Sequence, residues 1–188
     1  LRREHNYKDG KQTGKQQGLL DGDFEQLYLF GQPRTTGHYK NGQKDGTWVQ
    51  IAESGDTLHI TTYREGNEEG LQVRFDRETG SRLKEYYKKN NRYDGLYREY
   101  DPATGELVYE ATYEFGRLNG KARSLVRDNR FDYWETSTYV NGRQTGPFES
   151  RYVKNDKVRE TGTYRNGHRT GRWKRYDING KLEMEWEE

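Results

Sequence analysis

Pairs of glycines four residues apart are the first places in this chain to look for chemistry, because glycine-rich loops can bind phosphate. Such pairs include Gly42/Gly46 and Gly142/Gly146. A phosphate-binding loop follows a strand, precedes a helix and, in the Walker type, ends in Lys-Ser/Thr after the last glycine. No pair here has that context, and the polar surroundings exclude a membrane-helix dimer motif. We therefore interpret these glycines as turn residues.

Side chains that bind metals or catalyse reactions are few and scattered. The four histidines, His5, His38, His59 and His168, lack the paired spacing of zinc sites. No Gly-x-Ser-x-Gly segment occurs, and the absence of cysteine excludes disulfides and thiolate chemistry. The sequence therefore predicts no enzymatic activity, no metal and no cofactor.

Aromatic side chains remain as the candidates, because they recur at regular intervals. One ladder is predicted at Tyr39, Tyr63, Tyr87, Tyr113, Tyr139 and Tyr164, and a second at Phe24, Trp48, Tyr97, Phe148 and Trp173. In one interpretation the rings stack on each other and hold the structure together. In the other they form an exposed face with polar rims for a partner.

These rings are positioned by a repeated pattern: an aromatic residue, two polar residues, Gly, three polar residues, Gly, any residue and a second aromatic residue. Repeats start at residues 15, 39, 63, 87, 113, 139 and 164, in steps of 24 to 26 residues. Lys15 replaces the first tyrosine, and Asn90 or Asn91 replaces a glycine. The predicted modules are 15–38, 39–62, 63–86, 87–112, 113–138, 139–163 and 164–188. Residues 1–14 are either a degenerate half-repeat or a linker.

Each module is predicted to contain two strands and two turns. The first turn spans the glycine pair, and a strand such as Thr47–Ile51 follows it. We expect positive φ at the first glycine of most pairs. The turn glycines are Gly42, Gly46, Gly66, Gly70, Gly116, Gly120, Gly142, Gly146, Gly167 and Gly171. Strands joined by such short turns must be antiparallel neighbours. The sequence therefore predicts an all-β, elongated, open antiparallel meander of about seven two-stranded repeats with no significant helix, about 65 Å long.

Composition agrees with a thin sheet. The hydrophobic fraction of 29% and charged fraction of 34% argue against a thick core, while periodic aromatic residues argue against disorder. A net charge of +2 creates no strong field for nucleic acid. There is no apolar run of 18 residues. Because the chain begins at Leu1 rather than methionine, we expect that upstream sequence has been removed, and the cellular compartment stays open.

The repeated core, best seen at Tyr39–Trp48 and Tyr164–Trp173, resembles the MORN repeat, and most closely the bacterial MORN-variant repeat of the YwqK-like proteins. The resemblance covers residues 15–188. It implies a scaffold for protein–protein interaction, and the antitoxin label common in that family implies a toxin as partner. The chain departs from the pattern at Gln72 and Ala122, which replace aromatic residues.

The module that starts at Tyr113 departs from the pattern most and is the candidate partner site. It lacks a glycine in its second turn. Its candidate residues are Arg123, Arg127, Arg130, Phe131, Tyr133 and Trp134. Arginine and aromatic residues are enriched at binding hot spots. Alternation places Phe131 and Tyr133 on one face and Trp134 on the other. The structural alternative is that Trp134 fills the space left by Ala122.

Three functions are compatible with the sequence. The first is a non-catalytic scaffold that binds another protein. The second is binding of phospholipid headgroups, for which the basic segments Lys88–Arg92 and His168–Arg175 are candidates. The third is carbohydrate binding on the aromatic face. No nucleic-acid partner is expected, the oligomeric state is open, and a bacterial envelope or secreted location is favoured over the cytoplasm.

Overall fold

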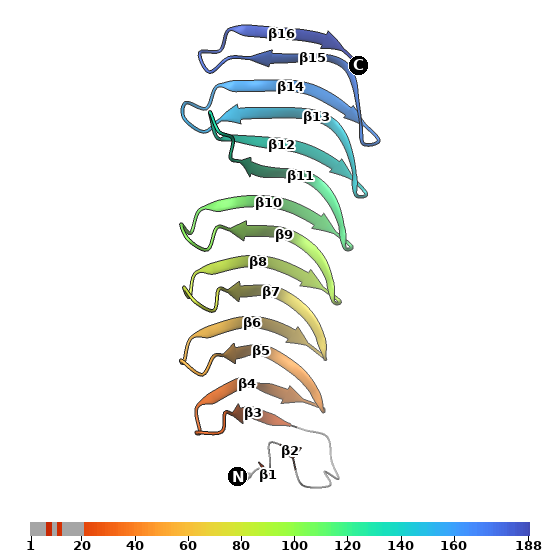
Figure 1. Cartoon of the computed structure of the whole chain (residues 1–188). Helices are drawn as coiled ribbons and strands as arrows, with labels where there is room; N and C mark the ends of the chain where they lie inside the picture. Colours follow the sequence, from red (N-terminus) through yellow and green to blue (C-terminus); the bar gives the residue numbers. More distant parts are fainter. Residues whose placement is uncertain (1–6, 9–10, 13–20) are drawn as a thin grey trace.

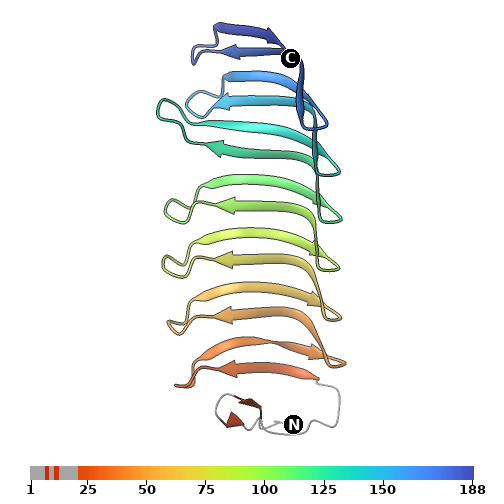
Figure 2. The ribbon, with the colours of Figure 1, turned by 45° about the vertical axis from the view of Figure 1, so that its right-hand side comes forward.

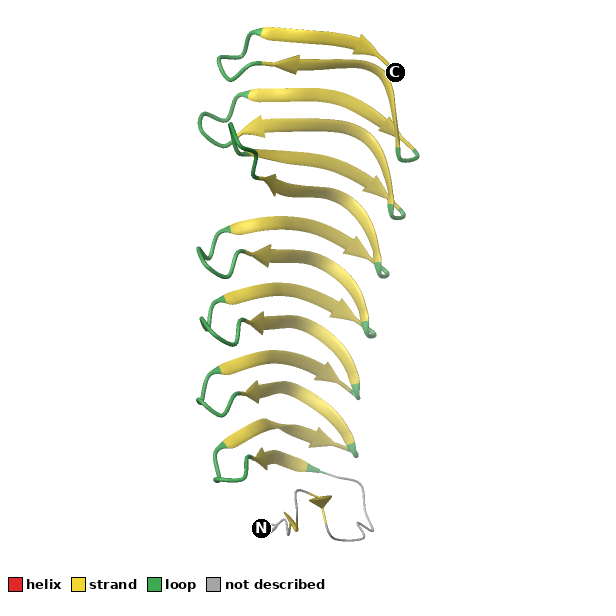
Figure 3. Ribbon diagram, viewed as in Figure 1, coloured by secondary structure: helices red, strands yellow, loops and turns green. Residues whose placement is uncertain are grey.

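The computed structural model of the chain is a single long antiparallel sheet (Figure 1). It describes residues 7–8, 11–12 and 21–188. Fourteen strands, β3 to β16, follow one another in the sheet in sequence order, and no helix occurs among the described residues (Figure 3). The predicted all-β, open antiparallel meander is therefore confirmed. With 13 spacings of about 4.8 Å between 14 strands, the sheet is about 60 Å long.

The strands are short and similar in length. Their bounds are β3 (Gly22–Leu27), β4 (Pro33–Lys40), β5 (Gln43–Ile51), β6 (Thr57–Arg64), β7 (Asn67–Phe75), β8 (Arg82–Lys89), β9 (Arg92–Tyr100), β10 (Leu107–Glu114), β11 (Arg117–Val126), β12 (Tyr133–Val140), β13 (Arg143–Tyr152), β14 (Val158–Arg165), β15 (His168–Tyr176) and β16 (Leu182–Glu187). Each strand is curved, and the ribbon is a stack of bowed hairpins (Figure 2).

The N-terminal segment is separate from this sheet. Two short strands, β1 (Tyr7–Lys8) and β2 (Lys11–Gln12), pair only with each other. Lys15, the predicted start of the first module, lies outside the described residues. The first described hairpin is β3–β4.

Two-residue turns with positive φ connect the hairpins along one edge of the ribbon. In the first, Asn41 and Gly42 have φ of 51° and 76°, as a type I′ turn requires. The corresponding pairs are Glu65-Gly66, Asn90-Asn91, Phe115-Gly116, Asn141-Gly142 and Asn166-Gly167. All ten predicted turn glycines have positive φ, and Asn91 takes the place of the first glycine in its repeat.

Hydrogen bonds tie each tight turn to the preceding repeat. The backbone amide of Gly66 donates to the carbonyl of Lys44, and that of Gly142 donates to Leu118. The residue before the second glycine adds a side-chain acceptor: Asp45 Oδ1 accepts the amide of Glu65 at 3.3 Å. Asp21, Asp94, Asn119 and Thr145 accept the equivalent amides. Successive turns are therefore stacked by side-chain capping.

The second glycine of each pair lies inside a strand, which corrects the prediction of one turn across both glycines. β5 starts at Gln43, and Gly46 belongs to it. The register between β4 and β5 shifts between Thr36 and His38, opposite this glycine. Gly46 has φ of 72°, a conformation that glycine adopts without steric cost. The chain therefore turns tightly once and then bulges within the strand.

One row of side chains runs across the middle of the sheet, with one residue from each strand. This central row is Phe24, Gly37, Trp48, Thr61, Gln72, Tyr86, Tyr97, Ala111, Ala122, Ser137, Phe148, Gly162, Trp173 and Trp186. Gly37 and Gly162 leave room for tryptophans, because a Cβ atom at either would lie 2.2 Å from the ring of Trp48 or Trp173. These two tryptophans are therefore each accommodated by a glycine on the preceding strand, whereas Tyr86 and Tyr97 stack on each other.

The rings form three clusters rather than continuous ladders. The first contains Phe24, Tyr39, Trp48 and Tyr63, with ring centroids 4.9 to 6.2 Å apart. The second contains Tyr86, Tyr93, Tyr97, Tyr109 and Tyr113. The third contains Phe148, Tyr164, Trp173 and Trp186. Gln72 separates the first two clusters, and Ala111 with Ala122 separates the last two.

Tyr87 does not belong to the ladder in which it was predicted. It is 45% exposed, whereas Tyr86 is 6% exposed and occupies the central row. Register explains the difference: Lys88 pairs with Tyr93, just as Tyr39 pairs with Lys44. Lys88 therefore holds the module-start position, and the tyrosine has moved to the partner strand.

Candidate binding surfaces

Two arginines of the predicted partner site are engaged by carboxylates. Arg123 lies 3.3 Å from Glu110, and its guanidinium stacks on Trp134 with 4.8 Å to the ring centroid. Arg127 bonds to Asp101 at 2.6 Å and to Glu106 at 3.1 Å. Both side chains therefore bridge neighbouring strands or turns of the ribbon.

The aromatic residues of this module lie on different faces. Tyr133 is buried, and the Arg159 guanidinium lies 3.8 Å from its ring centroid. Trp134 lies on the other face of the sheet, where it pairs across the strands with Leu125 and Arg151. Ala122 lies on the Tyr133 face. The suggestion that Trp134 fills the space left by Ala122 is therefore wrong.

Three residues of this region form an exposed group that we call the Phe131 patch: Arg130, Phe131 and Val153. Phe131 is 40% exposed and Val153 is 52% exposed. The Phe131 ring packs edge-on against Tyr152 at 5.7 Å, and the Val153 amide donates to the carbonyl of Asp132. The structure thus brings together two adjacent loops, 127–132 and 153–157. The sequence pointed to the first loop and missed the second.

The two basic segments predicted for lipid binding are partly neutralised. Lys88 is hydrogen-bonded to Glu68. Glu160, which is 2% exposed, lies 3.2 Å from Arg169 and 2.7 Å from Arg175. Glu185 faces Arg172 and Lys174 in the same way. These cations are therefore paired with carboxylates of neighbouring strands.

Four of the predicted ladder rings are buried, and the others except Tyr87 are half-buried. Trp48, Tyr97, Phe148 and Trp173 are all 8% exposed or less. The Trp48 indole N–H donates to the His38 carbonyl at 3.2 Å. Their contacts with each other favour the structural interpretation of the ladders.

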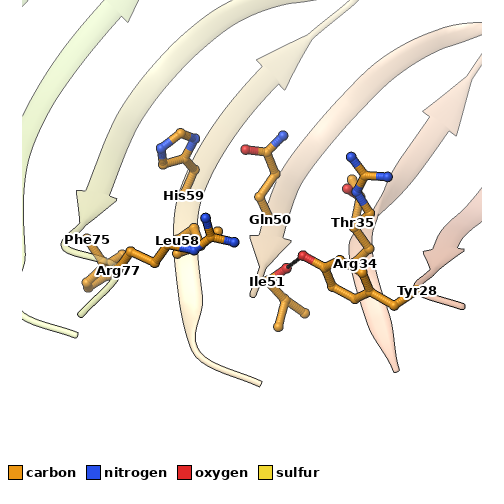
Figure 4. A pocket seen from close by; sticks show the side chains of 9 residues that line it. All are labelled: Tyr28, Arg34, Thr35, Gln50, Ile51, Leu58, His59, Phe75 and Arg77. Atoms are coloured by element: carbon orange, nitrogen blue, oxygen red, sulfur yellow. Dashed lines mark hydrogen bonds between the residues drawn. The ribbon is translucent and has the colours of Figure 1, made fainter. Parts of the chain in front are cut away.

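A hollow near the N-terminal end of the sheet was not anticipated from the sequence. This hollow, which we call the Arg34 hollow, has a volume of about 380 Å³. Its lining residues are Tyr28, Arg34, Thr35, Gln50, Ile51, Leu58, His59, Phe75 and Arg77. Figure 4 shows the guanidinium groups of Arg34 and Arg77 on either side of Gln50. The Tyr28 hydroxyl donates to the Ile51 carbonyl at 2.9 Å and so fixes the rim.

The hollow lies on a second cross-strand row, next to the central row and on the same face. This polar row is Gln26, Thr35, Gln50, His59, Arg74, Lys84, Glu99, Tyr109, Ser124, Glu135, Ser150, Glu160, Arg175 and Met184. Burial, followed by the positive charge of Arg74, lowers the pKa of His59 below its ordinary value of 6.5. The first carboxylate in the row is Glu99, on β9. The end of the row that lines the hollow therefore carries only neutral and basic side chains.

No protein-family model matches the chain, and no curated protein matches it. Within residues 21–188 and the two short N-terminal strands, no three His, Cys, Asp or Glu side chains are grouped so that they could hold a metal ion. In the same part of the chain, no helix is long and apolar enough to cross a membrane.

Proposed function

We propose that this protein is a non-catalytic repeat scaffold that binds another protein. The observation that carries the proposal is the Phe131 patch, where two loops of an elongated ribbon present arginine and apolar side chains together. Aromatic residues and arginine are the types most enriched at binding hot spots. An edge-on contact with Tyr152 holds the Phe131 ring in place while leaving 40% of the residue exposed. Such a preformed anchor loses little conformational freedom on binding.

The ribbon supports the same proposal at larger scale. Each hairpin adds two strands to an open sheet, so the protein offers a long surface rather than a deep cleft. Its turn pattern resembles the bacterial MORN-variant repeat of the YwqK-like proteins, and we propose membership of that group. A toxin neutralised by the scaffold is the partner that the resemblance suggests. Pairing of the basic segments with carboxylates makes a lipid surface the weaker candidate.

Affinity capture with matched variants tests this proposal. The full chain and a Phe131→Ala/Val153→Ser variant are immobilised, and proteins captured from a cell lysate are quantified. A Leu29→Ala variant is the control, because Leu29 is 91% exposed in a different loop. We expect the wild type and the control to capture the same protein in similar amounts. The patch variant should capture about tenfold less of it.

The control should unfold at the wild-type temperature, and the patch variant slightly below it, because it loses only the edge-on contact between Phe131 and Tyr152. Capture of the same proteins in equal amounts by the patch variant would contradict the assignment of the patch. Failure of the wild type to capture any protein above a blank resin would contradict the scaffold function.

A further inference from the structure

We infer that the Arg34 hollow is a binding site for an acidic peptide segment, whose carboxylates pair with Arg34 and Arg77 and whose apolar side chains pack against Leu58 and Ile51. This site lies toward the opposite end of the ribbon from the Phe131 patch. It goes beyond the proposed function and does not depend on that patch.

The arginines in and beside the hollow have aromatic neighbours but no carboxylate partner. Arg34 lies over the Tyr28 ring, with 5.7 Å to its centroid, and Arg74, which is next to the hollow, donates to the Tyr86 hydroxyl at 3.3 Å. Arg34, Arg74 and Arg77 are exposed and make no ion pair with any residue that the structure describes. Farther along the same face, Lys84 pairs with Glu99 at 2.6 Å and Arg175 pairs with Glu160 at 2.7 Å. Cations farther along this face are therefore neutralised by carboxylates of the protein itself, whereas Arg34, Arg74 and Arg77 are not.

Asp76, which precedes Arg77 in the sequence, is bonded within its own turn. Asp76 Oδ1 accepts hydrogen bonds from the backbone amides of Glu78 and Thr79 at 3.0 and 2.8 Å, and from the Thr79 hydroxyl at 3.0 Å. These bonds lower the pKa of Asp76, so the carboxylate stays ionised and bonded within the turn. It is not among the lining residues of the hollow. An external carboxylate is thus the missing complement to the two guanidinium groups.

The composition of the hollow specifies more than charge. Gln50 and Thr35 supply neutral hydrogen-bonding groups beside Arg34, while Leu58, Ile51 and Phe75 supply apolar surface. A volume of about 380 Å³ is within the range of about 300–1,000 Å³ seen for small-ligand sites. Carboxylates that alternate with apolar side chains match this mixture, because an extended peptide places alternate side chains on opposite sides.

Fluorescence anisotropy with a short labelled peptide of alternating glutamate and leucine tests the inference on the full chain. The variant is Arg34→Gln/Arg77→Gln. The charge-matched control is Arg92→Gln/Arg143→Gln, because these arginines are exposed at the tight-turn edge and do not line the hollow. We expect saturable binding that weakens about tenfold or more in the hollow variant and changes less than about twofold in the control.

Two further arms make the test specific. A peptide with glutamine in place of glutamate should bind about tenfold more weakly. The Phe131→Ala/Val153→Ser variant should bind the acidic peptide like the wild type, so that loss of the proposed scaffold function and loss of this site can be told apart. Addition of the peptide should also shift the NMR signals of the His59 imidazole.

Four results would overturn the inference. They are no saturable binding, equal weakening in the hollow and control variants, equal binding of the glutamine peptide, and tighter binding of phosphatidylserine vesicles with the same dependence on Arg34 and Arg77. The last result would assign the hollow to a lipid surface. Thermal unfolding of each variant checks that binding was measured on folded protein.

Discussion

At the residue scale, the tight turns place two successive residues in the left-handed region. Asparagine and glycine tolerate this region well, whereas a bulky side chain is strained there. Most first positions are asparagine, but Phe115 has φ of 49°. Its side chain is 68% exposed and therefore gains little from burial. This turn is locally less favourable than its neighbours.

We therefore predict that Phe115→Asn stabilises the protein. Removing left-handed strain from a non-glycine residue should raise the free energy of unfolding by about 1 kcal/mol. The reverse exchange in the equivalent turn, Asn141→Phe, should lower it by a similar amount. Chemical denaturation of the three proteins measures both effects. A less stable Phe115→Asn protein would show that the phenylalanine makes a contact that offsets the strain.

His59 gives a second prediction at this scale. It faces Gln50 on β5 and Arg74 on β7, with Arg77 in the same hollow. Burial and Arg74 lower its pKa, so the folded protein binds the proton less well than the unfolded chain does. Above the unfolded pKa of 6.5, His59 is neutral in both states and does not lower the free energy of unfolding. As pH falls from about 7 through 6.5 toward the lower folded pKa, the unfolded chain takes up the proton first, and the free energy of unfolding decreases.

NMR titration should therefore give a pKa below 6.5 for His59, with the signal assigned from His59→Gln. Arg74→Gln should raise that pKa toward its ordinary value, because it removes the positive charge. The His59→Gln protein should lose less stability than the wild type between pH 7 and pH 5. A His59 pKa above 6.5 would mean that an acidic group faces the ring in solution.

At the element scale, two tryptophans over glycines of the preceding strands show how the central row accommodates these large rings. Trp48 lies over Gly37 and Trp173 lies over Gly162, whereas Gln72 faces Thr61. The Gln72 amide donates to the Thr62 carbonyl, as the Trp48 indole does to His38. In these three repeats, a tryptophan therefore lies over a glycine and the smaller glutamine lies opposite a threonine.

A double-mutant cycle tests this coupling. Gly37→Ala alone should lower the free energy of unfolding by about 1–3 kcal/mol, because the added Cβ atom would lie 2.2 Å from the Trp48 ring. In a protein that already carries Trp48→Gln, the indole is absent and the added Cβ atom meets no ring. There, Gly37→Ala should lower the free energy of unfolding by less than about 0.5 kcal/mol. Equal costs in the two backgrounds, measured by denaturation, would show that the ring moves aside freely.

Much of this element-scale organisation could be predicted from the sequence, because spacing determines it. Glycine at fixed intervals identified the tight turns, with asparagine in place of glycine at Asn90-Asn91, and short turns required antiparallel neighbours. The position of Tyr87 could not be predicted, because an Asn90-Asn91 turn allows two registers that differ by one residue. A one-residue shift moves every side chain to the other face. Pairings such as Gly37 with Trp48 were missed because they join strands across a turn, and the repeat pattern does not mark Gly37.

The candidate sites were less predictable for a related reason. Composition identified arginine and aromatic residues near Phe131, but not that Asp101 and Glu106 engage Arg127. The Arg34 hollow combines residues from four strands and two loops, and none of them belongs to a motif. Its charge imbalance appears only when the cross-strand row is followed through the sheet.

At the scale of the whole molecule, the ribbon has no single central core. Buried side chains are spread along the sheet from Trp48 on β5 to Trp173 on β15. On the face opposite the ring clusters, Arg98 of β9 lies 3.1 Å from Glu85 of β8 and 2.7 Å from Glu110 of β10. Ion pairs on this face therefore also link each strand to its neighbours. Each hairpin therefore contacts mainly its two neighbours, as in other repeat proteins.

This arrangement predicts that one repeat can be removed without loss of the fold. Tyr63 and Lys88 occupy equivalent positions before their turns, so deletion of residues 64–88 would join β6 to the Asn90-Asn91 turn in register. The shortened sheet loses two strands, or about 10 Å of length. We expect a cooperative but somewhat less stable protein.

Small-angle scattering measures the result. A compact domain of 188 residues would have a radius of gyration of about 16 Å, whereas a ribbon about 60 Å long should give about 20 Å. Deletion of the repeat should reduce the ribbon value by about 2 Å, because length dominates the radius of a rod-like particle. A deletion variant that unfolds would contradict nearest-neighbour stabilisation and would mean that distant hairpins depend on one another. A wild-type value near 16 Å would mean that the ribbon folds back on itself in solution.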